Sequence, residues 1–558
     1  MPRRRHHLAA LVAGTLCAAS VVTVFGSTPA LAATPPVVTF TTVATGFVQP
    51  TEVTSTPALP GHVLVTERTG LVKIVDTTTG AASTYLDLTT VVNSVVGEQG
   101  LLGLAFAPDF AGTGRLYVTF TDATAALVLR RITVSNPTAL NPGSVTSQDL
   151  LTVPHPAVGV HNGGSLAFDS AGRLLISTGD GGPGGVGGAT PDPNLNGRNV
   201  NTLLAKILRI DVGPTCAAAS YCIPVGNPFA AGGGSPEIWM TGVRNPWRIA
   251  TDPATQQVFI ADVGQDRWEE LDVLPESSTG GDLEWSCREG LELFEPANPA
   301  RCPSMPAQTP PVAPVTVMCH AAVTGCVPDD TAGSIIGGQV YRGSAYAGLL
   351  GGAYVFGDYI SGNVWTWSGG VRTRVGSLLH VTSFGLDPSG EMWATTFDPN
   401  LFDGNLVRLQ ATPGSTPPPV TPPASGGGGG GSSSGGGSAG STPAVTAPVA
   451  PVVIPVSVPQ PAVVVVARPA RLLGVLVRTR KASATIRWQA PLANSPAVSY
   501  EYRYRVNGGA FGPWRSTGRS SLALKGLRGG KGYVVELRAV NVAGPGPVVR
   551  VRFTTMQA

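Results

Sequence analysis

The sequence predicts an all-β protein: a six-bladed β-propeller over residues 34–410 and an immunoglobulin-like β-sandwich over residues 468–556. A unit of two paired strands recurs six times in the first region. A stretch rich in Pro, Gly and Ser at 411–467 cannot bury a core and is expected to be a linker. Alternation of apolar and polar residues returns after it, as half-buried strands require. The chain has 558 residues, too many for one ordinary core.

Composition disfavours some classes of function. Charged residues make up 13% of the chain and the formal net charge is +3. No large electrostatic field is expected from these totals, so nucleic acid is not an expected partner. The 72 glycines and 50 prolines are typical of many turns between short strands.

Residues 1–32 are predicted to be a secretory signal. Arginines occupy positions 3–5, residues 8–25 are mostly apolar, and residues 30–32 offer an A-x-A cleavage site. A membrane anchor is the weaker alternative, because the cleavage site follows the apolar run. No other run is long enough to cross a bilayer. We therefore expect a secreted, extracellular protein without a stable membrane span.

Six cysteines follow the predicted signal. An even count in an exported protein predicts disulfides, each joining sequence neighbours. The expected pairs are Cys216 with Cys222, Cys287 with Cys302, and Cys319 with Cys326. Zinc ligation is the alternative, disfavoured because no Cys-x-x-Cys spacing occurs.

In the first region, a turn that usually carries glycine precedes an apolar strand, a polar break and a second strand. The six copies begin at Gly61, Gly114, Gly172, Gln257, Gly352 and Gly390. This repetition predicts six blades, with residues 37–43 as the strand that closes the last one. A jelly roll is the alternative that the repeats disfavour. Insertions at 179–203, 212–235 and 276–335 are expected on one face, where propellers carry their sites.

The second region shows strand-like alternation and turn signals. The alternating segments are 483–488, 500–505 and 533–540. Trp488, and Tyr533 shortly after Leu527, fit a small sandwich with a tyrosine corner. With its ending at 538–545, the region resembles a fibronectin type III domain. Nothing in it looks catalytic, and the roles of spacer and of attachment to a surface or polymer stay open.

The stretch 159–168 carries the most suggestive chemistry. His161 and Asn162 precede Gly163 and Gly164, which permit a sharp turn and a close backbone approach. An imidazole held there can act as a general base. A histidine that only caps a turn is the alternative that these ten residues leave open.

Motifs that span nearly all of residues 37–410 resemble the soluble glucose/sorbosone-type dehydrogenases, which depend on pyrroloquinoline quinone (PQQ). They lie at 97–106, 161–164, 179–182, 201–211, 242–247, 262–265, 337–343 and 356–362. The branch of aldose dehydrogenases and Hedgehog-interacting-protein-like domains is the most similar. The resemblance implies PQQ and calcium as cofactors and an aldose or sugar-polymer end as substrate. Because no Cys-x-x-Cys-His haem motif occurs, electrons are expected to leave to an external electron acceptor.

The resemblance also implies residue roles. His161 matches the general base that takes the anomeric hydroxyl proton while hydride passes from C1 to C5 of the quinone. Arg244 matches the arginine beside the quinone C5 oxygen, where a guanidinium would stabilise negative charge; an inter-blade salt bridge is its alternative. Asn245 and Gln265 match cofactor contacts. Gln99 matches a sugar-contacting glutamine, for which a loop hydrogen bond is the alternative.

Calcium is implied beneath the quinone, held by the backbone carbonyls of Asp266 and Arg267. Four further aspartates are possible calcium-loop residues, although turn capping is the expected role of each. They are Asp180, Asp192, Asp262 and Asp358.

Several positions depart from the family pattern. Val160 and Gly181 stand where glucose-oxidising members have an aspartate and a sugar-contacting glutamine. Ile360, Thr382 and Phe384 stand where those members have cofactor-binding cations, which would hold the carboxylates of PQQ.

Arg342 and His380 are the candidates to replace these cations; otherwise PQQ binding is weak or absent. The alternative function is a non-catalytic propeller that binds a glycan or protein, with a sandwich domain for adhesion. A propeller lactonase or lyase is a third possibility, disfavoured because no cluster of metal-binding carboxylates is evident in the sequence.

Overall fold

The computed structural model describes residues 34–156, 159–182, 191–213, 216, 220–399, 403–414, 472–489, 499–506, 509–517, 521–541 and 544–556. The predicted signal and most of the predicted linker lie outside these residues. Within them, no helix is both long enough and apolar enough to cross a membrane.

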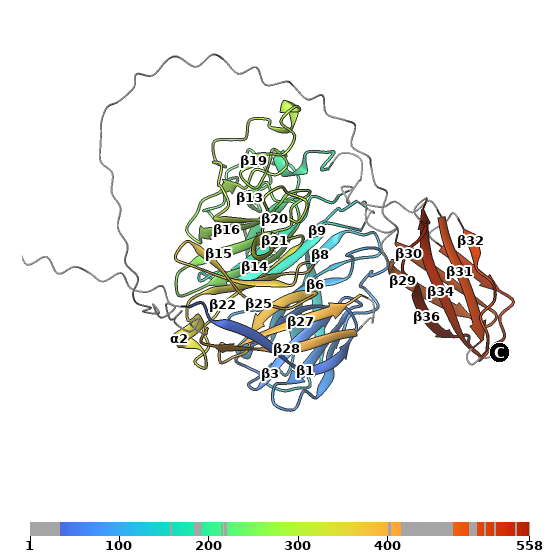
Figure 1. The fold of residues 1–558 in the computed structure, drawn as a ribbon. Coiled ribbons are helices and arrows are strands. Elements are labelled where there is room, and N and C mark those ends of the chain that lie inside the picture. The colour runs from blue at the N-terminus through green and yellow to red at the C-terminus, as the bar shows by residue number, and fades with distance from the viewer. Residues whose placement is uncertain are drawn as a thin grey trace, which may run out of the picture.

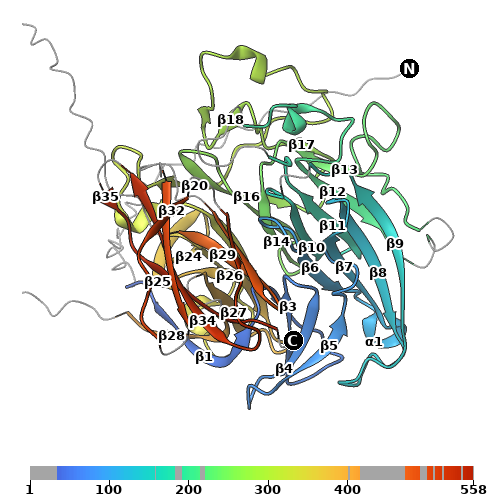
Figure 2. The ribbon, with the colours of Figure 1, turned by 90° about the vertical axis from the view of Figure 1, so that its right-hand side faces the viewer.

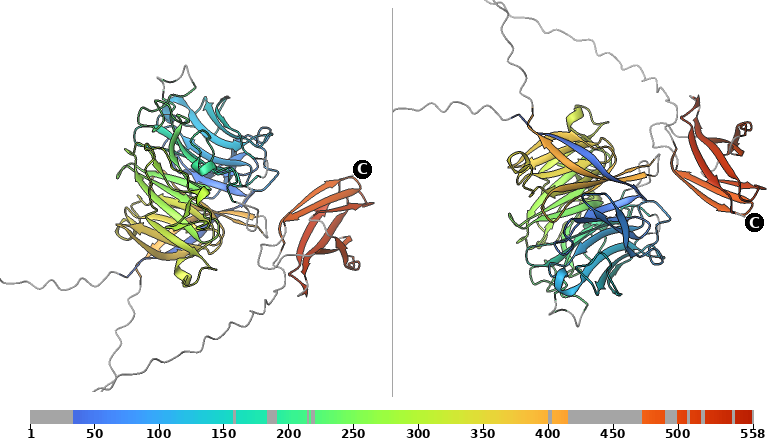
Figure 3. Two further views of the ribbon diagram at one scale, coloured as in Figure 1. Left: turned by 90° about the horizontal axis from the view of Figure 1, so that it is seen from above. Right: turned by 90° about the horizontal axis from the view of Figure 1, so that it is seen from below.

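The first region is a six-bladed propeller, and its blades follow the chain around the ring (Figures 1 and 3). Each blade is built on four antiparallel strands. The first blade holds β2 (Pro50–Thr54), β3 (His62–Glu67), β4 (Leu71–Asp76) and β5 (Ala82–Asp87), and the second holds β6 (Leu101–Phe106), β7 (Arg115–Thr121), β8 (Leu127–Val134) and β9 (Val145–Val153). The third holds β10 (Gly163–Phe168), β11 (Arg173–Thr178), β12 (Lys206–Asp211) and β13 (Ile238–Thr241), and the fourth holds β14 (Pro246–Asp252), β15 (Gln257–Asp262), β16 (Trp268–Pro275) and β20 (Thr316–His320). The fifth holds β22 (Ile335–Val340), β23 (Tyr354–Asp358), β24 (Asn363–Ser368) and β25 (Val371–Ser377), and the sixth holds β26 (Val381–Leu386), β27 (Met392–Asp398), β28 (Asp403–Thr412) and β1 (Val37–Phe47).

The N-terminal strand closes the ring. β1 pairs antiparallel with β28, from Val37 opposite Thr412 to Phe47 opposite Gly404, and lies beside it in Figure 1. The prediction that residues 37–43 supply this strand is confirmed. Because the pairing continues to Thr412, the last blade ends two residues beyond the predicted boundary at 410.

Apolar packing between blades explains why six units close into one body. Each of the six predicted strand pairs forms the second and third strands of a blade. The first strands form the inner ring, and each contacts the first strands of both neighbouring blades. Between each pair of adjacent blades lies a cluster of buried apolar side chains. Burial of these faces stabilises the ring.

The direction of the strands defines two ends of the ring. We call the end where the first strands begin the entrance face; it carries the loops before the first strands and those between second and third strands. The insertion 212–235 joins β12 to β13 at the opposite end, so the prediction that all three insertions share one face is wrong. The insertion after β16 reaches the entrance face because β17 (Gly281–Asp282) runs parallel to β13.

All three predicted disulfides are present: Cys216–Cys222, Cys287–Cys302 and Cys319–Cys326. Each closes a short segment, with sequence separations of 6, 15 and 7 residues. The neighbour pairing expected from the sequence is therefore confirmed.

The second region is the predicted β-sandwich (Figure 2). One sheet holds β29 (Leu473–Arg480), β30 (Ser483–Gln489) and β33 (Ser521–Lys525); the other holds β32 (Arg515–Thr517), β31 (Ser499–Val506), β34 (Gly532–Asn541) and β36 (Val549–Thr554), with β35 (Gly544–Pro545). Trp488, Tyr500 and Tyr533 are buried between the sheets. The Tyr533 hydroxyl accepts the N–H of Arg528 at 2.8 Å, which is the expected tyrosine corner. This arrangement is the predicted immunoglobulin-like β-sandwich.

Candidate functional site

His161 lies on the entrance face, two residues before β10, in a left-handed backbone conformation with φ of 54°. Its N–H donates to the Glu98 carboxylate at 2.9 Å, and its carbonyl accepts from the His155 ring at 3.0 Å. A non-glycine residue in this conformation needs such support from its surroundings. The imidazole is therefore held by groups on both sides of its backbone.

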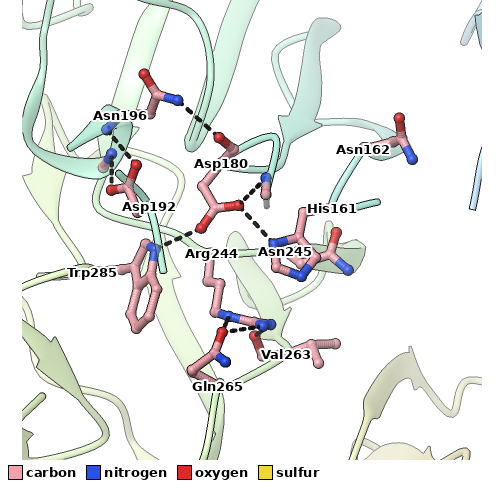
Figure 4. A network of polar contacts seen from close by, with 12 residues as sticks. His161, Asn162, Asp180, Asp192, Asn196, Arg244, Asn245, Val263, Gln265 and Trp285 are labelled. Carbon is pink, nitrogen blue, oxygen red and sulfur yellow. Dashed lines mark hydrogen bonds and ion pairs between the residues drawn. The ribbon is translucent and has the colours of Figure 1, made fainter. Parts of the chain in front are cut away.

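The His161 ring is paired with Asp180, the residue two positions after β11. Nδ1 of His161 lies 2.7 Å from Oδ1 of Asp180, and Asp180 is 1% exposed. The Trp285 indole donates to the other carboxylate oxygen at 3.0 Å (Figure 4). Burial raises the pKa of Asp180, but the charge and hydrogen bond of His161, with Arg244, outweigh it, so the pKa is lowered overall. An ionised Asp180 orients the ring and leaves Nε2 for proton transfer.

Asp180 also accepts the N–H of Gly182 at 2.9 Å, so the expected turn cap is real. Its pairing with His161 is a contact that sequence reasoning did not predict. The nearby Asp192 and Asn196 extend the network: Asn196 donates to the Asp180 carbonyl at 2.8 Å, and Asp192 accepts the Asn196 N–H at 2.7 Å. Asp192 thus caps a turn, as expected.

Arg244 is fixed beside this pair at the same end of the ring. Its Nε and Nη2 atoms donate to Oε1 of Gln265 at 3.0 and 2.6 Å, and Nη1 donates to the Val263 carbonyl at 2.8 Å. Its guanidinium lies 5.7 Å from the centre of the Trp285 ring, and its carbonyl accepts the Asp180 N–H at 2.8 Å. His161 and Arg244 therefore belong to one cluster, joined through Asp180 (Figure 4).

Asp262 and Asn245 hold the loops of the third and fourth blades together. The Asp262 carboxylate accepts the N–H groups of Arg244 and Asn245, each at 2.7 Å. Burial raises its pKa to about 7, although these two hydrogen bonds oppose the shift. The Asn245 side chain accepts the Gly163 N–H at 3.2 Å and donates to Glu98 at 3.4 Å. Asp262 is a turn-capping aspartate, as expected.

Gln99 lies on the entrance-face loop before β6. Its side chain is buried and accepts from Asn93 at 3.4 Å, which matches the loop hydrogen bond left open as its alternative role. The loop meets the His161 loop closely, since a Cβ on Gly97 would lie 2.3 Å from the Gly159 carbonyl. Sequence reasoning did not single out Glu98, which bonds both His161 and Asn245.

Asp266 and Arg267 are exposed on the loop between β15 and β16. The backbone N–H groups of this turn converge on one oxygen of Glu289, at 2.7 to 3.2 Å. The Arg267 carbonyl already accepts the His320 N–H at 2.8 Å and keeps one lone pair. Within the described residues, no three His, Cys, Asp or Glu side chains are arranged to hold a metal ion. Asp358 caps the turn that follows it, at Ile360 and Ser361.

Positions 360, 382 and 384, where the resemblance predicts cofactor-binding cations, hold neutral side chains in the structure. Ile360 is 56% exposed, while Thr382 and Phe384 are buried in the last blade. Arg342 cannot replace them, because it pairs with Asp252, the last residue of β14, at the end of the ring opposite the entrance face. That expectation is wrong, and strand direction is the reason.

Two other basic side chains do lie on the entrance face. His380 precedes β26, and its ring centre is 5.1 Å from that of Tyr359. Arg68 follows β3 and donates to the Gln99 carbonyl at 2.7 Å. Burial lowers the pKa of Arg68 although Glu98 opposes the shift. Sequence reasoning singled out His380 but not Arg68, which occurs in no recognised motif.

With this geometry in view, residues 47–285 match the family described as glucose/sorbosone dehydrogenase. This match lies within the propeller region and covers less than half of the chain. The HIPL1 protein of Arabidopsis thaliana is 30% identical over 350 residues, 54% of this chain and 48% of that protein. Aldose sugar dehydrogenase YliI of Escherichia coli is 26% identical over 185 residues, 32% of this chain and 44% of that protein. Human Hedgehog-interacting protein is 28% identical over 312 residues, 53% of this chain and 39% of that protein.

The chain thus spans about half the length of the curated relatives it matches. Among solved structures, the PQQ-bound aldose sugar dehydrogenase of Streptomyces coelicolor matches with a TM-score of 0.50 and 23% identity, covering 68% of this chain and 100% of that one. A glucose dehydrogenase matches with a TM-score of 0.53 and 21% identity, covering 67% and 100%. These likenesses support the propeller fold of the family.

Proposed function

We propose that the chain is an exported dehydrogenase, dependent on PQQ and calcium, that oxidises an aldose or the end of a sugar polymer. The observation that carries the proposal is the buried His161–Asp180 pair beside Arg244 on the entrance face. The family match supports the same chemistry, because named relatives include an aldose sugar dehydrogenase and a quinoprotein glucose dehydrogenase. The three disulfides support export, since such bonds persist in oxidising compartments.

His161 is the proposed base. Asp180 holds Nδ1, so Nε2 is the atom that takes the proton from the anomeric hydroxyl. The ionised carboxylate then stabilises the imidazolium that forms, as in other His–Asp pairs. The indole of Trp285 fixes the far carboxylate oxygen and limits its rotation. His161, Asp180 and Trp285 thus together accept the proton and stabilise the charge that it brings.

The residues of the site fit a carboxylated quinone. Arg244 and Asn245 would hold it, and the Arg68 guanidinium and the His380 ring lie on the same face, where the side chains at 360, 382 and 384 are neutral. When bound, PQQ supplies the electrophilic carbonyl that accepts hydride from the sugar.

Calcium would be held by the carbonyls of Asp266 and Arg267, on the turn that Glu289 fixes. Hard oxygen ligands suit this ion, and each carbonyl offers two lone pairs. The hydrogen bond from His320 occupies one of those on Arg267. A calcium site here therefore needs further ligands from the cofactor or water.

A binding assay tests the proposal before any substrate is known. The mature chain with calcium should bind PQQ at micromolar concentration by calorimetry, and should reduce an artificial electron acceptor when given aldoses. His161→Ala should keep PQQ binding and lose turnover. The dehydrogenase proposal is falsified if no PQQ binding is detected under these conditions.

The neutral side chains at 360, 382 and 384 favour a second candidate, a propeller that binds a glycan or protein without turnover. The named relatives include Hedgehog-interacting proteins as well as dehydrogenases. Retention of a glycan on an array by protein that neither binds PQQ nor reduces an acceptor would support this candidate.

A further inference from the structure

The two folded regions carry opposite charge, which the overall value of +3 conceals. Residues 468–556 hold 16 Lys and Arg and only two acidic residues, Glu501 and Glu536, a net charge of +14. The rest of the chain holds 21 Lys and Arg and 32 Asp and Glu, a net charge of −11. Thirteen of the 16 basic residues of the sandwich are arginines. Such asymmetry within a chain indicates an anionic partner for the basic part.

The sheet of β31, β34 and β36 gathers arginines on its outer face. Residues opposite one another in the register form rows across the strands. One row is Arg503, Glu536 and Arg550. The next is Arg505, Val534 and Arg552, which contains no acidic residue. Tyr533, Val535 and Leu537 alternate with these positions and belong to the core, so the rows face outward.

The second row holds the strongest unbalanced charge of this face. Arg552 is exposed. Arg505 donates Nη1 to the Gly509 carbonyl at 2.8 Å, while its buried Nε atom has no partner. In the first row, Glu536 neutralises part of the charge by bonding both Arg503 and Arg550.

Aromatic rings fix the guanidinium groups on this face. The Arg503 guanidinium lies 4.8 Å from the centre of the Phe511 ring and 4.6 Å from that of Trp514. Arg505 lies 4.6 Å from Phe511, and Arg538 lies 4.1 Å from Trp514. These stacks hold planar donors in set positions, which lowers the entropy lost when an anion binds.

We propose that this face, the basic sheet face, binds a carboxylate-bearing polysaccharide and so anchors the exported chain to an acidic polymer. Planar guanidinium groups pair with carboxylates through two parallel hydrogen bonds, and a polymer repeats that group along its length. Nucleic acid fits less well, because single strands stack on open aromatic platforms and the rings here lie against guanidinium groups.

The propeller of the same chain is a poorer partner than its net charge suggests. Many of its carboxylates are buried and already bonded within the ring. Asp180 accepts from His161, Asp262 from Arg244, and Glu269 from His320. These groups cannot reach another surface, so the acidic total overstates the charge that the propeller presents.

Binding of the mature full-length chain to immobilised polygalacturonate tests the proposal, with neutral dextran as the control surface. We expect retention on polygalacturonate at low salt, its loss as salt screens the charges, and no retention on dextran. The double variant Arg505→Gln/Arg552→Gln should weaken binding about tenfold or more, since each charge near an anionic surface contributes about 1 kcal/mol. Arg552→Gln alone, at an exposed position, should weaken it about fivefold.

Lys525→Gln/Lys531→Gln is the matched control, because it removes the same charge from outside the basic sheet face and should change affinity less than about twofold. Equal losses in the two double variants would overturn the assignment to this face. Absence of retention at low salt would overturn the proposal, and so would equal or tighter binding of double-stranded DNA. Acceptor reduction by the propeller is measured separately, so failure here is distinguishable from failure of the dehydrogenase proposal.

Discussion

His161 and Asp180 meet because Gly163 and Thr178 are paired across the hairpin of β10 and β11. The histidine lies two residues before one strand, and the aspartate lies two residues after the other. Antiparallel pairing therefore brings both to the entrance face, where Nδ1 and Oδ1 are 2.7 Å apart. The hairpin that supports the third blade thus also builds the proposed base.

Replacement of Asp180 by asparagine should remove the charge that orients and stabilises the His161 ring. We expect turnover of the PQQ-loaded protein to fall about 10²- to 10⁴-fold, since positioned acid–base groups supply rate factors of this size. Affinity for PQQ should change little. Steady-state acceptor reduction and calorimetry measure the two effects. Asp122→Asn, at an exposed turn, is the control, and equal losses in both variants would count against the pairing.

Arg244→Lys keeps the positive charge but cannot reproduce the contacts to Gln265 and Val263. Because lysine lacks the planar fork of arginine, we expect PQQ to bind about 10- to 100-fold more weakly. Calorimetric titration measures this. Arg131→Lys, whose partner is the exposed Gln148, should bind PQQ as the parent does. Unchanged affinity in the Arg244 variant would separate this arginine from the cofactor.

The Cys287–Cys302 bridge closes the segment that follows Trp285. Its removal in Cys287→Ser/Cys302→Ser should lower the free energy of unfolding by about 3 kcal/mol, as expected for a loop of about 15 residues. Turnover should also fall, because Trp285 bonds Asp180. Calorimetric melting and acceptor reduction report the two effects.

Cys216→Ser/Cys222→Ser is the comparison, because that bridge lies beyond β12 at the opposite end of the ring. This variant should lose about 2 kcal/mol of stability and keep its turnover. Equal loss of turnover in both variants would mean that the bridges act only through global stability.

Glu52 and Arg248 line a cavity of about 270 Å³ formed by residues from the first strands of all six blades. Burial raises the pKa of Glu52 from 4.5 to about 7, while Arg248 and the Leu104 N–H oppose the shift. The folded state therefore binds this proton more tightly than the unfolded chain. The resulting stability is fully present below about pH 4.5 and is lost as the pH rises to about 7.

Glu52→Gln should remove that component, which is at most about 3 kcal/mol for a shift of this size. Urea unfolding at pH 5, 6, 7 and 8 should show a shallower decline of stability in the variant than in the parent chain. Asp109→Asn, at a half-exposed carboxylate, should leave the slope unchanged. Identical slopes in the parent and Glu52→Gln would show that Glu52 is ionised in the fold across this range.

Much of the architecture follows from sequence patterns. Recurring glycine turns and alternating strands predict six blades, the closing strand and the sandwich, because burial of blade faces imposes the same local pattern in each unit. Neighbouring cysteines predict their own pairing. The prediction that the three insertions share one face failed because it used only their length. The end of the ring at which a loop emerges depends on how many strands of its blade precede it.

The sequence by itself determined the blade count and the disulfides, and it made His161, Arg244, Asn245 and Gln265 candidate site residues, because these inferences depend on local pattern and on motifs that resemble a known family. Only the tertiary structure decided which groups those residues contact. In the structure His161 pairs with Asp180, and Trp285, 105 residues later in the sequence, bonds the same carboxylate. Arg342 lies at the end of the ring opposite the entrance face. These distances depend on how the blades pack into a closed ring, so they cannot be calculated from the separation of the residues in the sequence.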